Sequence, residues 1–286
     1  NVVVFVDLVF GASGGCSGSG AAYILFGHWN ALPFNDIDLS SLDPGAGFAV
    51  NGANNGDQTG ACVRSAGDVN GDGLDDILVS APYASVPGRV NAGTVYVIFG
   101  RTGSSTLSLG ALAPGPTTGF RILGALQGDA FGSSVSAGRD INHDGYSDIV
   151  IGSMFVAGLG RVQSGVVTVL YGRSASYAYG NVDLQGYVFT PQSGFQVYGA
   201  APGDQLGTAV AVVDHNSDHG PDIVMSASFA SPYNRANAGT LYVLFGKGYA
   251  EPTSQPSTQP SSQPSTLPTA FSYDVDLKRP LRNGFV

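Results

Sequence analysis

The sequence predicts an all-β fold, a segment of a β-propeller made of four-stranded antiparallel blades. Composition gives the first indication, because 42 of the 286 residues are Gly and the chain is rich in Val, Ile, Tyr, Phe and Thr. Glycine favours turns, and β-branched and aromatic residues favour strands. The second indication is that 20 of the 21 acidic residues are Asp, which suits turns rather than long helices. The third is an internal repeat.

The repeat has a nearly constant period. An apolar run that closes on a glycine recurs along the chain, and the closing residues are Gly27, Gly100, Gly172 and Gly246. The phrases GFAVNGA, GFRILGA and GFQVYGA keep the same period, as do GDQTGACV, GDAFGSSV and GDQLGTAV. The first full period has four apolar runs, near 47–52, 61–66, 76–81 and 94–99, with the length and composition of strands. Radial stacking of such four-stranded sheets gives a propeller, whereas linear solenoids usually have shorter periods of roughly 20–50 residues.

The period sets the expected domain boundaries. Residues 1–30 would hold the last two strands of a truncated blade, and 31–100 and 101–172 would be complete blades. Residues 173–246 would be a blade with a degenerate acidic loop, and 247–286 would begin a further one. This organisation predicts an open arc, with a ring closed by the two ends as the alternative.

A Pro/Ser/Thr/Gln tract, PTSQPSTQPSSQPSTLP, occupies residues 252–268. It has almost no apolar side chains to bury, so we expect a disordered insertion in an inter-blade loop that could carry O-linked glycans. An interdomain linker is the alternative, and the resumed phrase VDLKRPLRNGFV at 275–286 argues against it.

Each full period also contains an acidic loop with one fixed spacing. Asp or Asn stands at positions 1, 3, 5 and 9, and position 7 can add a backbone carbonyl. The candidate ligands are Asp68, Asn70, Asp72, Leu74 and Asp76 in acidic loop 1, Asp140, Asn142, Asp144, Tyr146 and Asp148 in acidic loop 2, and Asp214, Asn216, Asp218, Gly220 and Asp222 in acidic loop 3. A solvated turn is the alternative, but repeated identical spacing favours a binding role.

An all-oxygen donor set in an irregular loop favours Ca²⁺ over Mg²⁺, which prefers octahedral geometry with several waters. An EF-hand would need a Glu at position 12 between two helices, and the residues there are Val79, Ile151 and Met225. The sequence therefore predicts a calcium loop between strands. In acidic loop 3, His219 replaces the turn glycine and Pro221 precedes the last Asp, so we expect weak calcium binding or none.

Several other functions are disfavoured. A net charge of −9 does not suit a nucleic-acid partner, and no apolar run approaches the roughly 18 residues of a membrane span. The stretch GASGG at 11–15 fits the G-x-S-x-G pattern, but a strand follows where that motif needs a helix, so we expect no enzyme activity in this chain. Pairing of Cys16 with Cys62 stays open.

The quoted motifs together resemble FG-GAP repeats. They are Phe-Gly at 26, 99 and 245, GDQ-x-G followed by Val, and D-x-N-x-D-G-x-x-D followed by an apolar strand. The Gly-Ala-Pro element is replaced by Ser80-Ala81-Pro82 in the first full period, which indicates a distant member. FG-GAP repeats build the propeller of integrin α subunits and occur in GPI-specific phospholipase D and in microbial surface proteins.

The resemblance implies calcium loops on one propeller face and ligands on the opposite face or rim. We therefore expect an extracellular or cell-surface propeller, stabilised by calcium at roughly 10⁻⁴ to 10⁻³ M, that binds a protein or glycan in adhesion. The alternative is the accessory propeller of a secreted hydrolase or phospholipase with its catalytic domain elsewhere.

Overall fold

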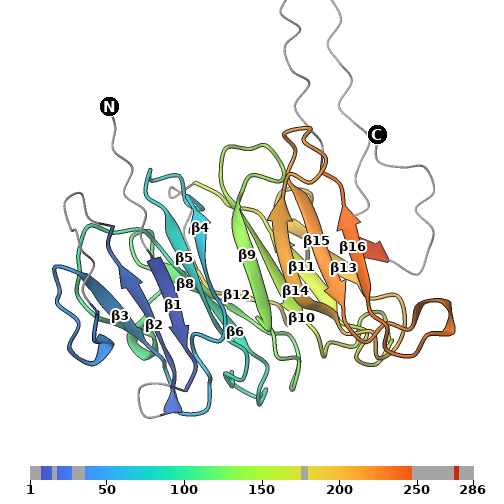
Figure 1. Cartoon of the computed structure of the whole chain (residues 1–286), viewed down its shortest axis with the longest axis horizontal. Coiled ribbons are helices and arrows are strands. Elements are labelled where there is room, and N and C mark those ends of the chain that lie inside the picture. Colours follow the sequence, from blue (N-terminus) through green and yellow to red (C-terminus); the bar gives the residue numbers. More distant parts are fainter. Residues whose placement is uncertain (1–7, 15–17, 28–35, 175–179, 247–273, 277–286) are drawn as a thin grey trace, which may run out of the picture.

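The computed structural model describes residues 8–14, 18–27, 36–174, 180–246 and 274–276. This part of the chain is all-β, as predicted. It contains no α-helix, only the short 3-10 turns η2 (Leu39–Ser41), η3 (Leu109–Ala111) and η4 (Pro232–Asn234). The strands form four sheets that stand side by side (Figure 1).

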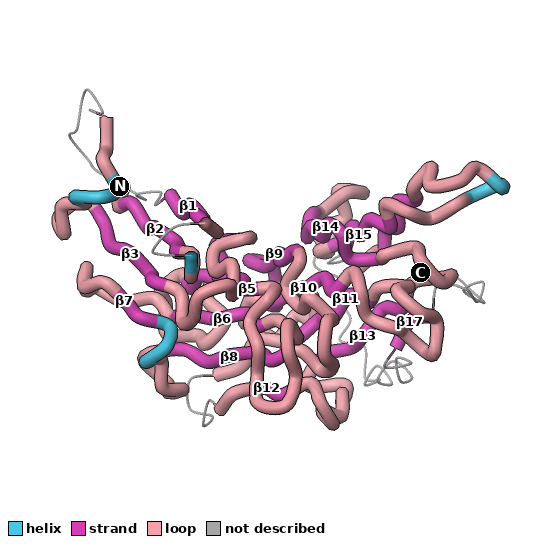
Figure 2. The backbone as a smooth tube through the Cα atoms, turned by 90° about the horizontal axis from the view of Figure 1, so that it is seen from below, coloured by secondary structure: helices cyan, strands magenta, loops and turns pink. Residues whose placement is uncertain are grey.

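The four sheets follow the order of the chain. The first sheet contains β1 (Leu8–Ala12), β2 (Ala21–Leu25), β3 (Gly47–Asn51) and β7 (Leu107–Ser108). The second contains β4 (Val63–Gly67), β5 (Asp76–Ala81), β6 (Thr94–Ile98), β8 (Gly119–Leu123) and β12 (Val182–Asp183). The third contains β9 (Ser134–Arg139), β10 (Asp148–Ser153), β11 (Val166–Leu170), β13 (Gly194–Tyr198) and β17 (Asp274–Asp276). The fourth contains β14 (Leu206–Val213), β15 (Asp222–Ala227) and β16 (Thr240–Leu244). Together they make an arc whose first and fourth sheets lie apart at its two ends (Figure 2).

The sheets are out of phase with the sequence period by one strand. The Gly-Phe strand that opens each period pairs with the strand before it, so that Phe120 of β8 faces Val97 of β6. β3 pairs with β2, and β13 with β11, in the same register. The expected range 31–100 therefore joins strands of two different sheets, and the ranges 101–172 and 173–246 each join strands of three. A repeat fixes the length of the structural unit but not where the unit begins, because any starting phase gives the same period.

A short parallel strand extends the outer edge of three sheets. The register pairs are Val50 with Leu107, Ile122 with Val182, and Val197 with Val275. The last of these three connections is the longest, and it includes the tract at 252–268, which lies outside the described part of the chain. The chain returns to the equivalent sheet edge after the tract, and insertion of the tract into an inter-blade connection stays a prediction.

The core lies between the sheets in three layers. β6 shows how one strand serves two layers. Val95, Val97 and Phe99 point between the second and third sheets, and Tyr96 and Ile98 point between the first and second. Burial of each large apolar side chain contributes about 1.5–3 kcal/mol. A strand buried on both faces reads as a continuous apolar run, as VYVIF does.

Adjacent sheets also meet through backbone hydrogen bonds near the loops that join β5 to β6 and β10 to β11. The amide of Phe131 donates to the carbonyl of Ala92 at 3.0 Å, and Leu206 donates to Ser164 at 2.9 Å. A side chain at Gly93 would overlap the backbone of Phe131, which explains the glycine there. Cys62 is half-buried beside the layer between the second and third sheets, and Cys16 lies outside the described residues.

Candidate metal centre

The acidic loops occupy equivalent places in three neighbouring sheets. Acidic loop 1 (68–76) joins β4 to β5, acidic loop 2 (140–148) joins β9 to β10, and acidic loop 3 (214–222) joins β14 to β15. They lie along the upper edge of the arc in Figure 1. The hairpin loops 82–93, 154–165 and 228–239, which join the next pair of strands in each sheet, lie at the opposite edge.

In acidic loop 1 the side-chain oxygens fold toward the loop's own backbone amides. Asp68 Oδ1 accepts from the amides of Gly71 (2.6 Å) and Asp72 (3.1 Å), and its Oδ2 accepts from Gly73 (2.8 Å). Asn70 Oδ1 accepts from the Asp72 amide, and Asp72 Oδ1 accepts from the Leu74 amide, each at 2.9 Å. The amides of the loop thus turn the oxygens of positions 1, 3 and 5 inward.

The other two loops repeat this arrangement. Asp140 accepts from the amides of Asp144 (3.0 Å) and Gly145 (2.7 Å). In acidic loop 3, Asp214 accepts from Asp218 (3.2 Å) and His219 (3.1 Å). Acidic loop 3 therefore keeps the shape of the other two despite its changed sequence.

Backbone conformation explains how acidic loop 3 does this. Positions 4 and 6 are left-handed in all three loops, and acidic loop 1 has Gly71 and Gly73 there. Acidic loop 3 holds Ser217 at φ 60° and His219 at φ 64°. Left-handed backbone costs a non-glycine residue about 1–2 kcal/mol. His219, which stands where acidic loop 1 has Gly73, therefore strains the backbone of acidic loop 3 but does not change its shape.

The Asp at position 9 has a structural role that sequence reasoning missed. Asp76 is fully buried, and its two oxygens accept from the amides of Val69 (2.9 Å) and Gly100 (2.8 Å). Asp148 and Asp222 make the equivalent pairs, and their glycine donors are Gly172 and Gly246. Each Asp thus ties its loop to the glycine of the Phe-Gly phrase. The available signal was the constant separation along the chain between this Asp and that glycine, which is 24 in all three cases.

Burial also changes the acidity of these groups. Desolvation raises the pKa of Asp76 to about 7, against the lowering effect of its two amide donors, and the charges of Asp72 and Asp68 add to the rise. The pKa of Asp148 is raised to about 7 for the same reasons, with Asp144 and Asp140 as the repelling neighbours. The carboxylates of one loop are therefore close enough to repel one another, and a bound cation would relieve this repulsion.

The donor chemistry of the loops fits a hard cation. In the described residues, no three His, Cys, Asp or Glu side chains converge as a formed metal site. In acidic loop 1 the amide of Asn70 supplies one of the oxygens, and Asp76 is turned toward Val69 and Gly100. The structure thus brings positions 1, 3 and 5 together and keeps position 9 as an anchor for the loop.

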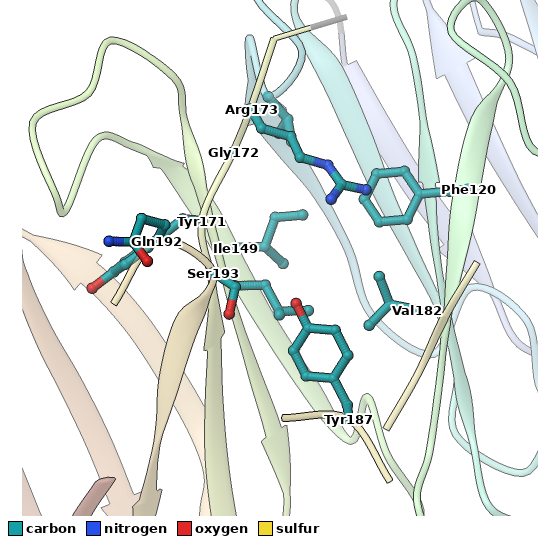
Figure 3. Close-up of a pocket in the computed structure, with 11 residues that line it drawn as sticks. Phe120, Ile149, Tyr171, Gly172, Arg173, Val182, Tyr187, Gln192 and Ser193 are labelled. Atoms are coloured by element: carbon teal, nitrogen blue, oxygen red, sulfur yellow. The ribbon is translucent and has the colours of Figure 1, made fainter. Parts of the chain in front are cut away.

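A small pocket lies between the second and third sheets, close to the start of acidic loop 1 (Figure 3). Phe120, Arg173, Tyr187 and Ser193 are among the side chains around it. Its volume of about 50 Å³ is far below the roughly 300 Å³ of small-molecule sites. It has room for a few water molecules, so an organic ligand would have to bind elsewhere.

The edge opposite the acidic loops carries exposed apolar side chains. We call this surface the hairpin edge, and its exposed large apolar residues are Tyr83, Val90, Leu126, Leu159, Val162, Phe229 and Tyr233. Tyr233 is 89% exposed at the tip of its hairpin loop, with φ 54°. No helix in the described part of the chain is long and apolar enough to cross a membrane.

Four stacked, mostly antiparallel sheets with a repeated loop at one edge define the class of the protein, a propeller-type repeat protein. A family model for the FG-GAP repeat matches residues 65–98 and 131–170. These segments include acidic loops 1 and 2, and acidic loop 3 lies outside them. The chain thus carries FG-GAP repeats.

Curated relatives fall into two groups. The chain is 29% identical over 212 residues to phosphatidylinositol-glycan-specific phospholipase D of Dictyostelium discoideum, covering 71% of this chain and 21% of the relative. It is 32% identical over 115 residues to the Bos taurus enzyme of the same name (40% and 13%). It is 37% identical over 110 residues to integrin alpha-3 of Cricetulus griseus (37% and 10%). The chain therefore spans about a fifth or less of each relative.

Proposed function

We propose that this chain is part of a calcium-stabilised extracellular propeller that binds a protein or glycan ligand with its hairpin edge. One observation carries the proposal, namely the division of the arc into an acidic edge and an apolar edge. Three carboxylate-rich loops line the first, where Leu74, Val213 and Phe245 are also exposed, and a larger group of exposed large apolar side chains lies along the second. A group of exposed apolar side chains on one edge of a soluble protein can mark an interaction site.

Calcium would have a structural role. In each loop the side chains at positions 1, 3 and 5 and the carbonyl at position 7 would hold the ion, which in acidic loop 1 means Asp68, Asn70, Asp72 and Leu74. The position-9 Asp would anchor the loop through its two amide donors. The ion would neutralise repelling carboxylates, and sites of this kind with affinities of roughly 10⁻⁴ to 10⁻³ M fill outside cells.

The hairpin edge fits a protein ligand, with a glycan as the second possibility. Exposed aromatic side chains such as Tyr83 and Tyr233 are enriched at protein interfaces. Aromatic rings at loop tips also suit stacking on sugar rings, so the ligand class is a question for experiment. The pocket between the second and third sheets is too small to compete with this surface.

An accessory propeller attached to a phospholipase is the alternative function. It is supported by the matches to the two enzymes named phosphatidylinositol-glycan-specific phospholipase D. The neighbouring coding sequence distinguishes the two, because a catalytic domain there favours the alternative and an adhesion-type architecture favours ligand binding.

Thermal melting tests the calcium proposal. Millimolar calcium should raise the melting temperature, because a ligand at about 10 times its Kd stabilises the folded state by about 1.4 kcal/mol. Asp72→Ala and Asp144→Ala should each reduce that gain, and Asp218→Ala should reduce it least. A melting temperature that is the same with and without calcium would rule the proposal out.

Ligand binding is tested on protein and glycan arrays in calcium and in chelator. Val162→Ser should weaken capture, because Val162 is 67% exposed on the hairpin edge. Val188→Ser is the matched control, since Val188 is 77% exposed but lies between β12 and β13, outside that edge. Equal losses in the two variants, or no capture by the parent chain, would contradict the proposed binding face.

A further inference from the structure

Acidic loops 1 and 2 contact each other across the gap between the second and third sheets. The amide of Ser147, at position 8 of acidic loop 2, donates to the carbonyl of Asp68 at 2.9 Å. The amide of Arg173, just after the third sheet's Phe-Gly-type phrase, donates to the carbonyl of Val69 at 3.0 Å. The first two residues of acidic loop 1 are thus held by the neighbouring sheet.

One peptide group joins the two loops. The carbonyl of Tyr146 and the amide of Ser147 belong to the same planar unit and point in opposite directions. The amide reaches Asp68 in acidic loop 1, and the carbonyl is the proposed position-7 ligand in acidic loop 2. A cation on that carbonyl would fix the plane of the peptide and polarise its N–H, which strengthens the hydrogen bond to Asp68.

The Tyr146 side chain makes a second connection. A side chain added at Gly71 would lie against the Tyr146 ring and overlap it, so the ring packs directly on position 4 of acidic loop 1. The amide of Gly71 donates to Asp68 Oδ1 at 2.6 Å. When acidic loop 2 fixes the Tyr146 ring, the ring in turn fixes the Gly71 peptide, whose amide orients Asp68, the first ligand of acidic loop 1.

Acidic loop 3 lacks both groups. Pro221 occupies the place of Ser147 and has no N–H to donate. Gly220 occupies the place of Tyr146 and has no ring to pack on His143, the position-4 residue of acidic loop 2. Acidic loops 1 and 2 are thus joined by both the Ser147 hydrogen bond and the Tyr146 ring contact. The sequence of acidic loop 3 can make neither of these two contacts with acidic loop 2.

From this difference we infer that calcium binding at acidic loops 1 and 2 is positively coupled and that acidic loop 3 binds independently. The inference rests on the proposed calcium binding and adds an order of events. Occupancy of one of the first two loops preorganises the other, so the second and third sheets are stabilised as a pair.

Calorimetric titration of the whole chain with calcium chloride tests the coupling. In an Asp218→Asn background, Asp72→Asn leaves acidic loop 2 to be measured alone, and Asp144→Asn leaves acidic loop 1. Each isolated loop should bind at least about 5-fold more weakly than in the two-loop protein, by the same factor for both, because coupling is reciprocal. With Asp218 restored, Asp144→Asn should leave the affinity of acidic loop 3 unchanged.

Position 147 supplies the decisive pair of variants. Ser147→Pro removes the bridging N–H with a residue that acidic loop 3 already has at the equivalent position, and Ser147→Ala keeps it. Coupling should fall in the first, where only the Tyr146 ring contact is left, and persist in full in the second. If Ser147→Pro does not fold, Tyr146→Ala tests the ring contact and should reduce the coupling.

The two proposals fail in different ways. Calcium binding with equal affinities in the one-loop and two-loop proteins overturns the coupling and leaves the calcium proposal standing. Coupling that survives both Ser147→Pro and Tyr146→Ala overturns the assigned route. Absence of calcium binding in the parent chain overturns both proposals.

Discussion

Gly172→Ala is the sharpest test of the link between the Phe-Gly-type phrase and the acidic loops. Gly172 is outside the left-handed region, so positive φ does not oppose alanine there. Its amide donates to Asp148 at 2.8 Å. An added Cβ would lie 2.5 Å from the Ser147 oxygen, 2.7 Å from the Tyr146 Cβ and 2.9 Å from the Val69 oxygen. Two of these three atoms belong to backbone carbonyls, which cannot rotate away.

The expected cost combines two effects. Overpacking of a tight site costs about 1–3 kcal/mol. Displacement of the Gly172 amide also leaves one oxygen of the fully buried Asp148 carboxylate without its donor, which costs about 1–3 kcal/mol. We expect a loss of about 3 kcal/mol in the free energy of unfolding. At about 2–4 °C per kcal/mol for a domain of this size, the melting temperature should fall by about 6–12 °C.

Gly103→Ala is the matched control. An added Cβ there would meet nothing within 4 Å, and the residue is outside the left-handed region. Alanine should leave stability unchanged or raise it by about 0.4–1 kcal/mol through the unfolded state. Urea and thermal unfolding of both variants measure the difference. A Gly172→Ala protein as stable as Gly103→Ala would refute the claim that this glycine packs on the acidic loop.

Three further changes test other parts of the structure. Burial raises the pKa of Asp129 from 3.8 to about 6. This carboxyl group therefore contributes stability that is complete below pH 3.8 and is lost as the pH rises through about 6. Asp129→Asn should flatten the dependence of the melting temperature on pH over this range, and an unchanged profile would contradict this. Asp183→Ala should cost about 1 kcal/mol, because Asp183 is 45% exposed and its charge is screened by water, although its partner Arg89, at 2.6 Å, is only 8% exposed. A urea midpoint equal to that of the parent would show that the pair contributes nothing. His219→Gly should raise the melting temperature in chelator by relieving about 1 kcal/mol of left-handed strain, and a fall would show that the imidazole stabilises the loop.

The repeats made the strands predictable, because each strand is buried between two sheets and leaves a continuous apolar run. They did not make the sheet boundaries predictable. Phe120 lies in the same period as β9 but pairs with β6, and this choice depends on which strands the connections bring together in space. Periodicity in sequence contains no information about that phase.

The acidic loops were only partly predictable. Alternating oxygens indicated a loop whose side chains turn inward, and the structure places positions 1, 3 and 5 in that way. Position 9 was predicted as one more ligand, and this stays a prediction, because both oxygens of Asp76, just like both oxygens of Asp68, accept backbone amides. Its partner Gly100 lies outside the loop, beyond the end of β6, and a local pattern of spacing cannot identify such a contact.

The fourth sheet keeps the repeated backbone with fewer glycines than the second. Ser217, His219 and Asn234 are left-handed where the second sheet has glycine. Each such residue costs about 1–2 kcal/mol, yet in acidic loop 3 Asp214 still accepts from the amides of Asp218 and His219, as the equivalent Asp does in the other two loops. The packing of the sheets therefore imposes the loop shape, and the loop sequence determines mainly how much strain that shape carries. Acidic loop 3 thus differs from the first two loops in sequence but keeps their backbone shape. What separates it from them is that Gly220 and Pro221 stand where acidic loop 2 has Tyr146 and Ser147.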